Sequence, residues 1–253
     1  MVKTLAASTL INWPIEHKIA FGYAPPFPEG RMPFGKMMFE LDEQEFIETT
    51  PNKFDLARTI EGIKEGKRQA DVVVVSLHTH EMSGKNIEES AQFTETFAHA
   101  CIDAGASVVI GHGPHLVRGI ERYKSGLIFY SLGNFIFQTE TIGQLPYDAL
   151  AEFNYPLDTL PGAYMDHRSR NGTIGFPVMK EIWQAVAASW EMEDGVIKSA
   201  RLYPLDLGMS KPRSQRGTPV LTQNTEVLER IQRLSEPYNT TIRIENGVGV
   251  IEL

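Results

Sequence analysis

The sequence has little cysteine, no long apolar run and no excess of positive charge. Its single cysteine, Cys101, rules out a disulfide within the chain. No apolar stretch approaches the roughly 20 residues that a helix needs to cross a bilayer, so we predict no transmembrane segment in the chain. The formal net charge of −8 argues against a nucleic-acid partner, because such a surface needs a basic face. An anionic substrate would have to be met by local cations.

The middle of the chain has the clearest secondary-structure pattern. Residues 72–77 (VVVVSL) are a β-branched run typical of a buried parallel strand, and residues 107–111 (SVVIG) form a second one. The segment between them, residues 87–104, has the apolar spacing of a helix. Strand, helix and strand of this length predict a right-handed βαβ unit with parallel strands. The predicted fold class is therefore α/β.

The flanking segments are assigned by their apolar period and their turn residues. We expect a strand at 17–23, a helix at 53–69, hairpins at 116–132, 184–205 and 241–252, and a helix at 225–234. Residues 139–180 show no strong period and are rich in Pro, Gly, Asp and Asn, which is typical of a lid or a substrate loop. We treat residues 1–253 as one domain.

Two histidine pairs follow the two central strands. His78 and His80 close the first strand, where side chains two positions apart share a face. His112 and His115 close the second, in the motif GHGPH, whose glycines permit sharp bends. Ligands of open parallel sheets bind at the carboxyl ends of the strands, so we predict that the four imidazoles converge there. Neutral imidazole binds zinc, iron, nickel and manganese, which indicates a divalent-metal or catalytic site.

Other polar side chains near these motifs have open roles. Glu81 is a bridging ligand, a general base, a partner that orients a histidine, or a plain surface carboxylate. Asn134 either holds a substrate oxygen or a metal-bound water, or caps a turn. Arg118 and Arg168 either clamp an anion or lie on the surface. His99 falls on the polar side of its predicted helix and is expected to face solvent.

Residues 70–138 resemble the CapA family of bacterial capsule-synthesis proteins, which is associated with poly-γ-glutamate. The matching text is VVVVSLHTHEMSG and then AHACIDAGASVVIGHGPHLVRGIERYKSGLIFYSLGNFIFQ. Residues 184–253 resemble the family more weakly. The family is similar to the calcineurin-like metallophosphoesterases, which implies an α/β/β/α sandwich with a dinuclear centre of divalent Mn, Fe or Zn. The resemblance implies that His78, His112 and His115 are metal ligands.

The segment after His78 departs from the family pattern. Many relatives have a Trp-Gly pair there, where this chain has Thr79-His80. At this position His80 and Glu81 either bind the metal or face the substrate. The candidate catalytic residues are His80, Glu81 and Asn134, and the candidate substrate-binding residues are Arg118 and Arg168.

Three family motifs that also contribute to the metal site (Gly-Asp, Asn-x-Glu and Asn-Asn-His) are not found in residues 1–70. The resemblance is thus to the C-terminal part of the family fold, and a partner chain could supply the other part. The expected activity is metal-dependent hydrolysis of a phosphoester or a γ-glutamyl amide in an anionic small molecule or polymer. The alternative is a non-catalytic assembly or polymer-handling component. Only the family implies work at the cell envelope; the sequence leaves the compartment open.

Overall fold

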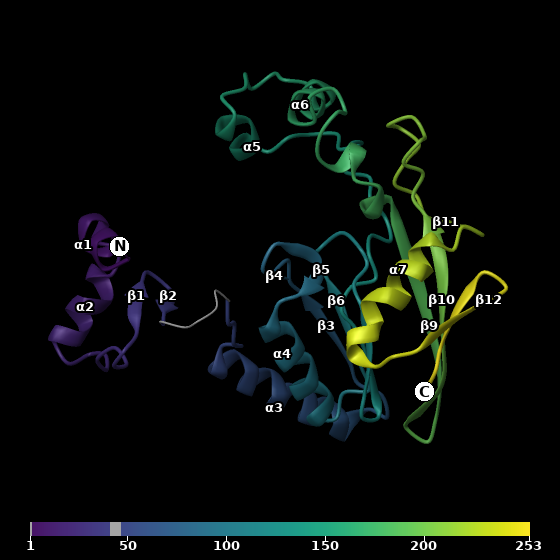
Figure 1. Cartoon of the computed structure of the whole chain (residues 1–253). Coiled ribbons are helices and arrows are strands. Elements are labelled where there is room, and N and C mark those ends of the chain that lie inside the picture. The colour runs from purple at the N-terminus through teal and green to yellow at the C-terminus, as the bar shows by residue number, and fades with distance from the viewer. Residues whose placement is uncertain (1, 41–46) are drawn as a thin grey trace. The chain divides into compact units, whose positions relative to one another are not determined.

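The computed structural model describes residues 2–40 and 47–253. The chain divides into two compact units, Met1–Ile47 and Glu48–Leu253 (Figure 1). The prediction that residues 1–253 make one domain stays a prediction, because a compact unit need not fold separately.

Within residues 2–40, the first unit contains two short helices and one hairpin. Its elements are α1 (Val2–Thr9), α2 (Trp13–Ala20), β1 (Met32–Phe34) and β2 (Met37–Phe39). The buried Asn12 joins the helices to the hairpin: its Nδ2 donates to the Pro33 carbonyl at 2.8 Å, and its Oδ1 accepts from the Gly35 amide at 2.8 Å.

The strand predicted at 17–23 is wrong. Trp13, His17 and Phe21 recur every four positions, and their rings lie 5.0 and 4.6 Å apart in succession. That spacing places side chains on one face of a helix, and α2 accordingly runs to Ala20.

The second unit begins with a helix and a four-stranded sheet. Its first elements are α3 (Lys53–Gln69), β3 (Val74–His78), β4 (Met82–Ser83), β5 (Asn86–Ser90), α4 (Gln92–Asp103), β6 (Val108–His112), β7 (Ile120–Tyr123) and β8 (Gly126–Phe129). The strand order is β3-β6-β8-β7, in which β3, β6 and β8 are parallel and β7 is antiparallel. The predicted βαβ unit is confirmed. Its helix begins at Gln92 rather than at residue 87, because residues 86–90 pair with β4 as a small hairpin.

A five-stranded antiparallel sheet follows. The remaining elements are α5 (Tyr147–Glu152), α6 (Pro161–Arg168), η1 (Phe176–Val178), η2 (Lys180–Trp183), β9 (Gln184–Glu193), β10 (Val196–Asp206), β11 (Val220–Leu221), α7 (Glu226–Ser235), η3 (Glu236–Tyr238), β12 (Ile242–Glu245) and β13 (Val248–Ile251). The order is β11-β10-β13-β12, with β9 on β10. The hairpins predicted at 184–205 and 241–252 and the helix at 225–234 are confirmed. Residues 139–180 contain α5 and α6, so this segment is more ordered than its composition predicts.

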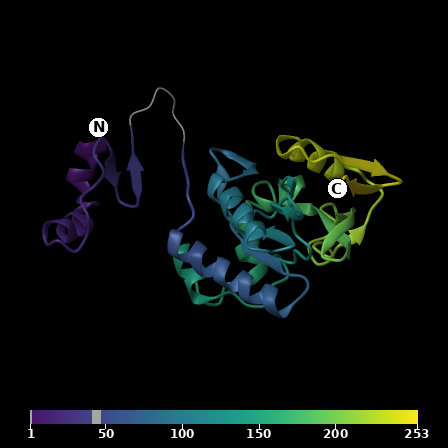
Figure 2. The ribbon, with the colours of Figure 1, turned by 90° about the horizontal axis from the view of Figure 1, so that it is seen from below.

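Two apolar cores hold the layers of the second unit together. One lies between the two sheets and includes Val108, Phe129, Val186, Leu202 and Leu228 of α7; the other lies between the four-stranded sheet and helices α3 and α4 and includes Ile63, Ala98 and Cys101. Figure 2 shows α3 and α4 together beside that sheet. This is an α/β fold, consistent with a metallophosphoesterase-like domain. No helix in the described part of the chain is long and apolar enough to span a membrane.

Candidate functional site

The four predicted histidines converge at the carboxyl edge of the parallel strands. His78 and His112 end β3 and β6 as direct partners in the strand register. The Nε2 atoms of His78 and His80 lie 3.2 Å apart, and the rings of His80 and His115 have centroids 5.7 Å apart. The predicted convergence is confirmed. It follows from parallel pairing, which brings both strand ends to one edge.

Asn134 orients the His115 ring. Its Nδ2 donates to the carbonyl oxygens of His115 and Ile182, both at 3.0 Å. Its Oδ1 lies 2.8 Å from Nδ1 of His115 and can only accept. His115 therefore carries a proton on Nδ1, and the Nε2 of the neutral ring keeps a free lone pair. This is the arrangement by which metal-binding or basic histidines are held, and it gives Asn134 a positioning role that sequence reasoning had not assigned to it.

The two glycines of the GHGPH motif make the close packing possible. A Cβ on Gly111 would lie 2.2 Å from the Tyr130 carbonyl oxygen, and one on Gly113 would lie 2.5 Å from the Thr79 carbonyl oxygen. Gly113 (φ 121°) and His115 (φ 64°) both have positive φ. Positive φ is costly for a residue with a side chain, so His115 depends on its surroundings, Asn134 included, to stay in place.

Electrostatics distinguish the acidic and basic groups of the edge. The Thr79 hydroxyl donates to the Glu81 carboxylate and lowers the pKa of Glu81, and the Glu81 and His80 amides act in the same direction. Burial, and then the charge of His78, lower the pKa of His112. These effects favour an ionised Glu81 and a neutral His112.

The two predicted substrate-binding arginines lie in opposite environments. Arg118 is only 1% exposed; its Nε donates to the Ile87 carbonyl at 3.1 Å, and its Nη1 has no hydrogen-bond partner among the described residues. Burial lowers the pKa of Arg118 to about 10. Arg168 is exposed and lies over the Phe176 ring at 5.8 Å. Phe176 in turn contacts the His115 ring, with centroids 5.6 Å apart, so Arg168 is the more accessible cation.

The expectation that His99 faces solvent is wrong. Its Nε2 lies 2.8 Å from a carboxylate oxygen of Glu121, and its ring stacks on Tyr123 at 3.9 Å. Glu121 also accepts a hydrogen bond of 2.6 Å from the Tyr130 hydroxyl. Helix periodicity placed His99 on a polar face, but His99 contacts Glu121 and Tyr123 of β7.

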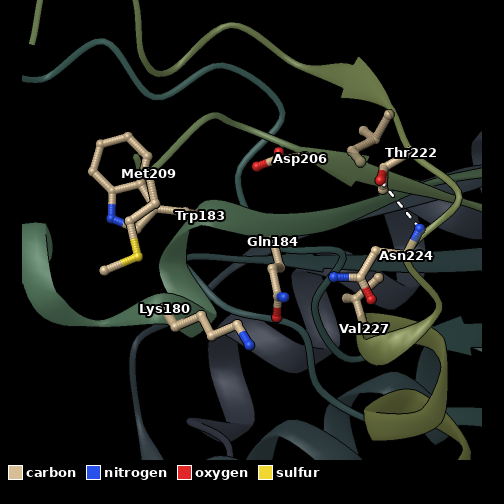
Figure 3. A pocket seen from close by; sticks show the side chains of 9 residues that line it. Lys180, Trp183, Gln184, Asp206, Met209, Thr222, Asn224 and Val227 are labelled. Atoms are coloured by element: carbon tan, nitrogen blue, oxygen red, sulfur yellow. Dashed lines mark hydrogen bonds between the residues drawn. The ribbon is translucent and has the colours of Figure 1, made fainter. Parts of the chain in front are cut away.

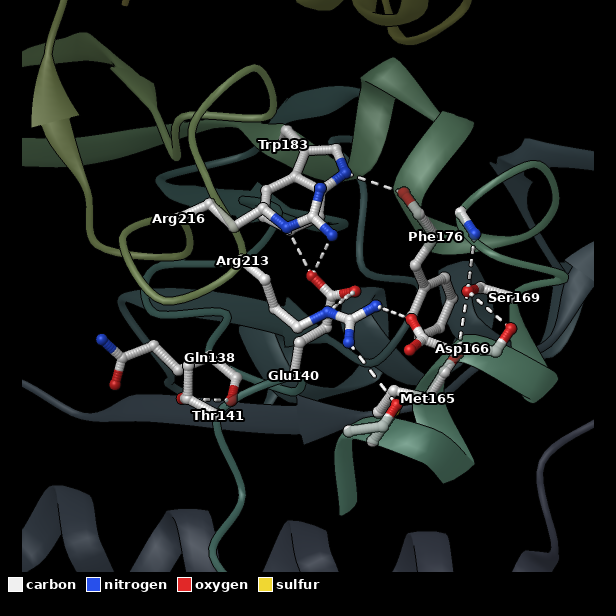
Figure 4. Close-up of polar contacts among 12 residues, drawn as sticks. Gln138, Glu140, Thr141, Met165, Asp166, Ser169, Phe176, Trp183, Arg213 and Arg216 are labelled. Atoms are coloured by element: carbon white, nitrogen blue, oxygen red, sulfur yellow. Dashed lines mark hydrogen bonds and ion pairs between the residues drawn. The ribbon is translucent and has the colours of Figure 1, made fainter. Parts of the chain in front are cut away.

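An ionic cluster connects Glu140, in the segment after β8, to Arg213 and Arg216 (Figure 4). The Glu140 carboxylate, 7% exposed, pairs with Arg216, and Arg213 bonds to Asp166 of α6 at 2.5 Å. The Arg216 guanidinium also lies 5.0 Å above the Trp183 ring. The Trp183 indole N–H in turn donates to the carbonyl of Phe176, whose ring lies beside the His115 ring.

The donor chemistry suits a metal ion only in part. Two imidazoles on one tetrahedral ion, at about 2.0–2.1 Å each, place their nitrogens about 3.3 Å apart. The Nε2 separation of 3.2 Å between His78 and His80 matches that value. However, residues 2–40 and 47–253 contain no group of three or more His, Cys, Asp or Glu side chains that could hold a metal ion. His80 lies at hydrogen-bond distance from His78, and its role stays a prediction.

These features define an α/β protein with a histidine-rich edge on a parallel sheet, and comparison with known proteins identifies its family. Residues 20–139 match the family described as bacterial capsule synthesis protein PGA_cap. The chain is 38% identical over 216 residues to the uncharacterized protein y4sH of Sinorhizobium fredii, covering 80% of this chain and 46% of that protein. It is 41% identical over 83 residues to the capsule biosynthesis protein CapA of Bacillus anthracis, covering 32% of this chain and 20% of CapA.

A similar match is found with the PGA biosynthesis protein CapA of Bacillus subtilis: 41% identity over 75 residues, or 30% of this chain and 19% of that protein. The chain belongs to the PGA_cap family of capsule synthesis proteins. It spans about half the length of the first relatives it matches.

Proposed function

We propose that this chain contributes a metal-dependent hydrolase site to capsule or poly-γ-glutamate biosynthesis. The observation that carries the proposal is the Nε2 pair of His78 and His80, 3.2 Å apart, with His112 and His115 at the same sheet edge. The bond cleaved is a phosphoester or a γ-glutamyl amide of an anionic molecule or polymer. A bound divalent ion such as Mn²⁺, Fe²⁺ or Zn²⁺ would lower the pKa of a water molecule towards neutrality and polarise the scissile group.

Three residues of the chain have the remaining roles in the proposed reaction. Glu81, whose pKa is lowered by the Thr79 hydroxyl, is ionised near neutral pH and accepts a proton. His115, held by Asn134, offers a free Nε2 lone pair. The exposed Arg168 guanidinium attracts the anionic part of the substrate.

Further ligands would come from residues that cover β3. Val74 and Val108 are register partners and therefore share a face of the sheet. Val108 is fully buried between the two sheets, whereas Val74 is 46% exposed. The second sheet therefore stops short of β3, which is the end strand of its sheet within the described residues. An apolar end strand is a site for pairing with another strand, and such a strand could bring the ligands that complete the site.

The test combines metal content with hydrolysis. The purified chain is loaded with Mn²⁺, Fe²⁺ or Zn²⁺, its metal is measured by mass spectrometry, and p-nitrophenyl phosphate and γ-glutamyl-p-nitroanilide serve as substrates. We expect His78→Ala and His112→Ala to lose metal and activity together. His167→Ala, which removes an exposed imidazole from α6, is the matched control and should retain both.

The competing function is a non-catalytic assembly or polymer-handling component, which the lack of a three-ligand group in the described residues favours. Less than about 0.2 equivalents of metal per chain after loading, with no hydrolysis of either substrate, would support it.

A further inference from the structure

Two segments next to the histidine edge are both joined to helix α7 by charged side chains. The first segment is the β4–β5 hairpin, which begins at Met82, directly after Glu81. The second is η2, in which the Ile182 carbonyl accepts a hydrogen bond from Asn134, the residue that orients His115. The position of each segment relative to α7 therefore affects the position of the histidines.

Helix α7 is a fixed reference for these segments. Its apolar residues recur at helical spacing and form one buried face. Three of them belong to the core between the two sheets: Val227, Leu228 and Ile231. At the end of the helix, the Ser235 hydroxyl accepts a hydrogen bond of 2.9 Å from the Ile120 amide of β7. A segment bound to α7 is thus held relative to both sheets.

The polar side of α7 binds η2 at its first turn. The Lys180 ammonium and the Gln184 amide both donate to the Glu226 carboxylate, at 2.6 and 3.2 Å. The same two residues line a pocket together with Val227 of α7 (Figure 3). These contacts place the start of β9 and the whole of η2 beside the N-terminal turn of α7.

One turn later, the Arg230 guanidinium contacts both segments at once. Its Nε lies 3.6 Å from a carboxylate oxygen of Glu88 in β5, and its Nη2 lies 3.8 Å from one of Glu181 in η2. Glu226 of α7 lies 3.9 Å from the same Nη2. The Arg230 side chain is only 10% exposed, so these ion pairs are screened less than surface pairs are. Among the described residues, no other side chain of α7 pairs with a carboxylate from each segment.

Arg233, which follows on the same helix, provides a comparison. It lies 2.8 Å from Glu88, but it is 59% exposed and makes no ion pair with η2 in the described part of the chain. We propose that Arg230 is a positioning residue, whose guanidinium sets the distance between the hairpin after His80 and the η2 segment that holds His115. This inference rests on the proposed function, because the distance matters only if the histidines act together.

The experiment follows the histidine ring signals of the full, metal-free chain by ¹H–¹⁵N NMR. Arg230→Met keeps an apolar stem and removes the guanidinium. We expect it to displace the ring signals of both His80 and His115. His99, which contacts β7, should keep its signal. A general loss of packing would displace the His99 signal as well, so this ring separates a positioning role from a merely structural one.

Arg233→Met is the matched control. It removes the same group from the same helix and from the same carboxylate, Glu88. Because Arg233 does not pair with η2 within the described residues, this variant should leave the His115 signal in place. Urea unfolding of both variants gives their stabilities for comparison.

Two further variants test each contact of the guanidinium separately, and they decide the case if Arg230→Met does not fold. Glu181→Gln should displace the His115 signal and leave that of His80, because Glu181 precedes the Ile182 carbonyl. Glu88→Gln should displace the His80 signal and leave that of His115.

A Zn²⁺ titration separates this inference from the proposed function. Arg230→Met should weaken Zn²⁺ binding about tenfold, as loss of a residue that orients metal ligands does. If the unaltered chain binds no Zn²⁺, the proposed metal site is wrong, and the ring signals alone decide the role of Arg230. That role is overturned if Arg230→Met leaves the His80 and His115 signals in place, if it displaces His115 no more than Arg233→Met does, or if Zn²⁺ affinity does not change in a chain that binds Zn²⁺.

Discussion

The His115 imidazole takes its tautomer and its orientation from one neighbour, Asn134. The Asn134 amide satisfies the carbonyl oxygens of His115 and Ile182 and accepts from the His115 ring. Sequence reasoning considered Asn134 as a substrate contact or a turn cap, since both roles suit an amide after a strand. The observed positioning role depends on a hydrogen bond to the Ile182 carbonyl, and Ile182 is 48 positions away from Asn134. A local sequence pattern cannot predict such a contact.

We expect Asn134→Leu to lower the free energy of unfolding by about 1–3 kcal/mol, because two carbonyl oxygens lose their donor. Urea unfolding measures the change, and ¹⁵N chemical shifts of His115 should show loss of the single Nδ1–H tautomer. Gln138→Leu removes an exposed amide that bonds only to Thr218, and should cost less than about 0.5 kcal/mol. An Asn134→Leu chain with unchanged stability and an unchanged His115 tautomer contradicts the positioning role.

Cys101 of α4 is fully buried in the core between α4 and the four-stranded sheet. Burial raises the pKa of its thiol to about 11, from an ordinary value of 9.0. Between pH 9 and 11 the unfolded chain loses this proton before the folded chain does, so the contribution of Cys101 to folding stability falls as the pH rises. Below pH 9 its contribution does not depend on pH.

We expect iodoacetamide at pH 8 to label Cys101 slowly in the native chain and rapidly in urea, as followed by mass spectrometry. Cys101→Ala should flatten the fall in stability between pH 9 and 11. Rapid native labelling would show that the thiol is accessible.

At the scale of elements, sequence patterns predict helices and tight hairpins well, because their hydrogen bonds join residues that are close in the sequence. The helix at 53–69 and the hairpin through Asp194-Gly195 appear where the sequence places them. The helix predicted from residue 87 failed at its first turn, because pairing with β4 and a hydrogen bond from Arg118 to the Ile87 carbonyl stabilise an extended chain there. The apolar periodicity of a segment carries no information about partners that lie outside that segment.

The glycines of the GHGPH motif allow the backbone segments next to the site to pack closely. Gly111→Ala should cost at least about 2 kcal/mol, because its Cβ would collide with the Tyr130 carbonyl of the adjacent strand. Gly62→Ala is the matched control: Gly62 lies within α3 with nothing within 4 Å of its added Cβ, and the change should stabilise by about 0.5–1 kcal/mol. Urea unfolding compares the two. Equal effects would mean that β8 can move away from β6.

At the scale of the whole molecule, the unit Glu48–Leu253 contains all the contacts described for the histidine cluster and both cores of the layered sheets. We therefore expect a chain of residues 48–253 to unfold cooperatively and to give histidine NMR signals like those of the full chain. Loss of cooperative unfolding would show that the first unit is needed and would favour a single domain.

The sequence by itself determined the α/β class, the parallel βαβ unit and the meeting of four histidines at one sheet edge, because strand polarity and side-chain alternation follow from residue order alone. Only the tertiary structure decided which groups those histidines contact, that His99 pairs with Glu121, and that Arg118 is buried. Each of these facts depends on side chains brought together from distant positions, and the free energy of burying or pairing a polar group is set by that environment rather than by its neighbours in the chain.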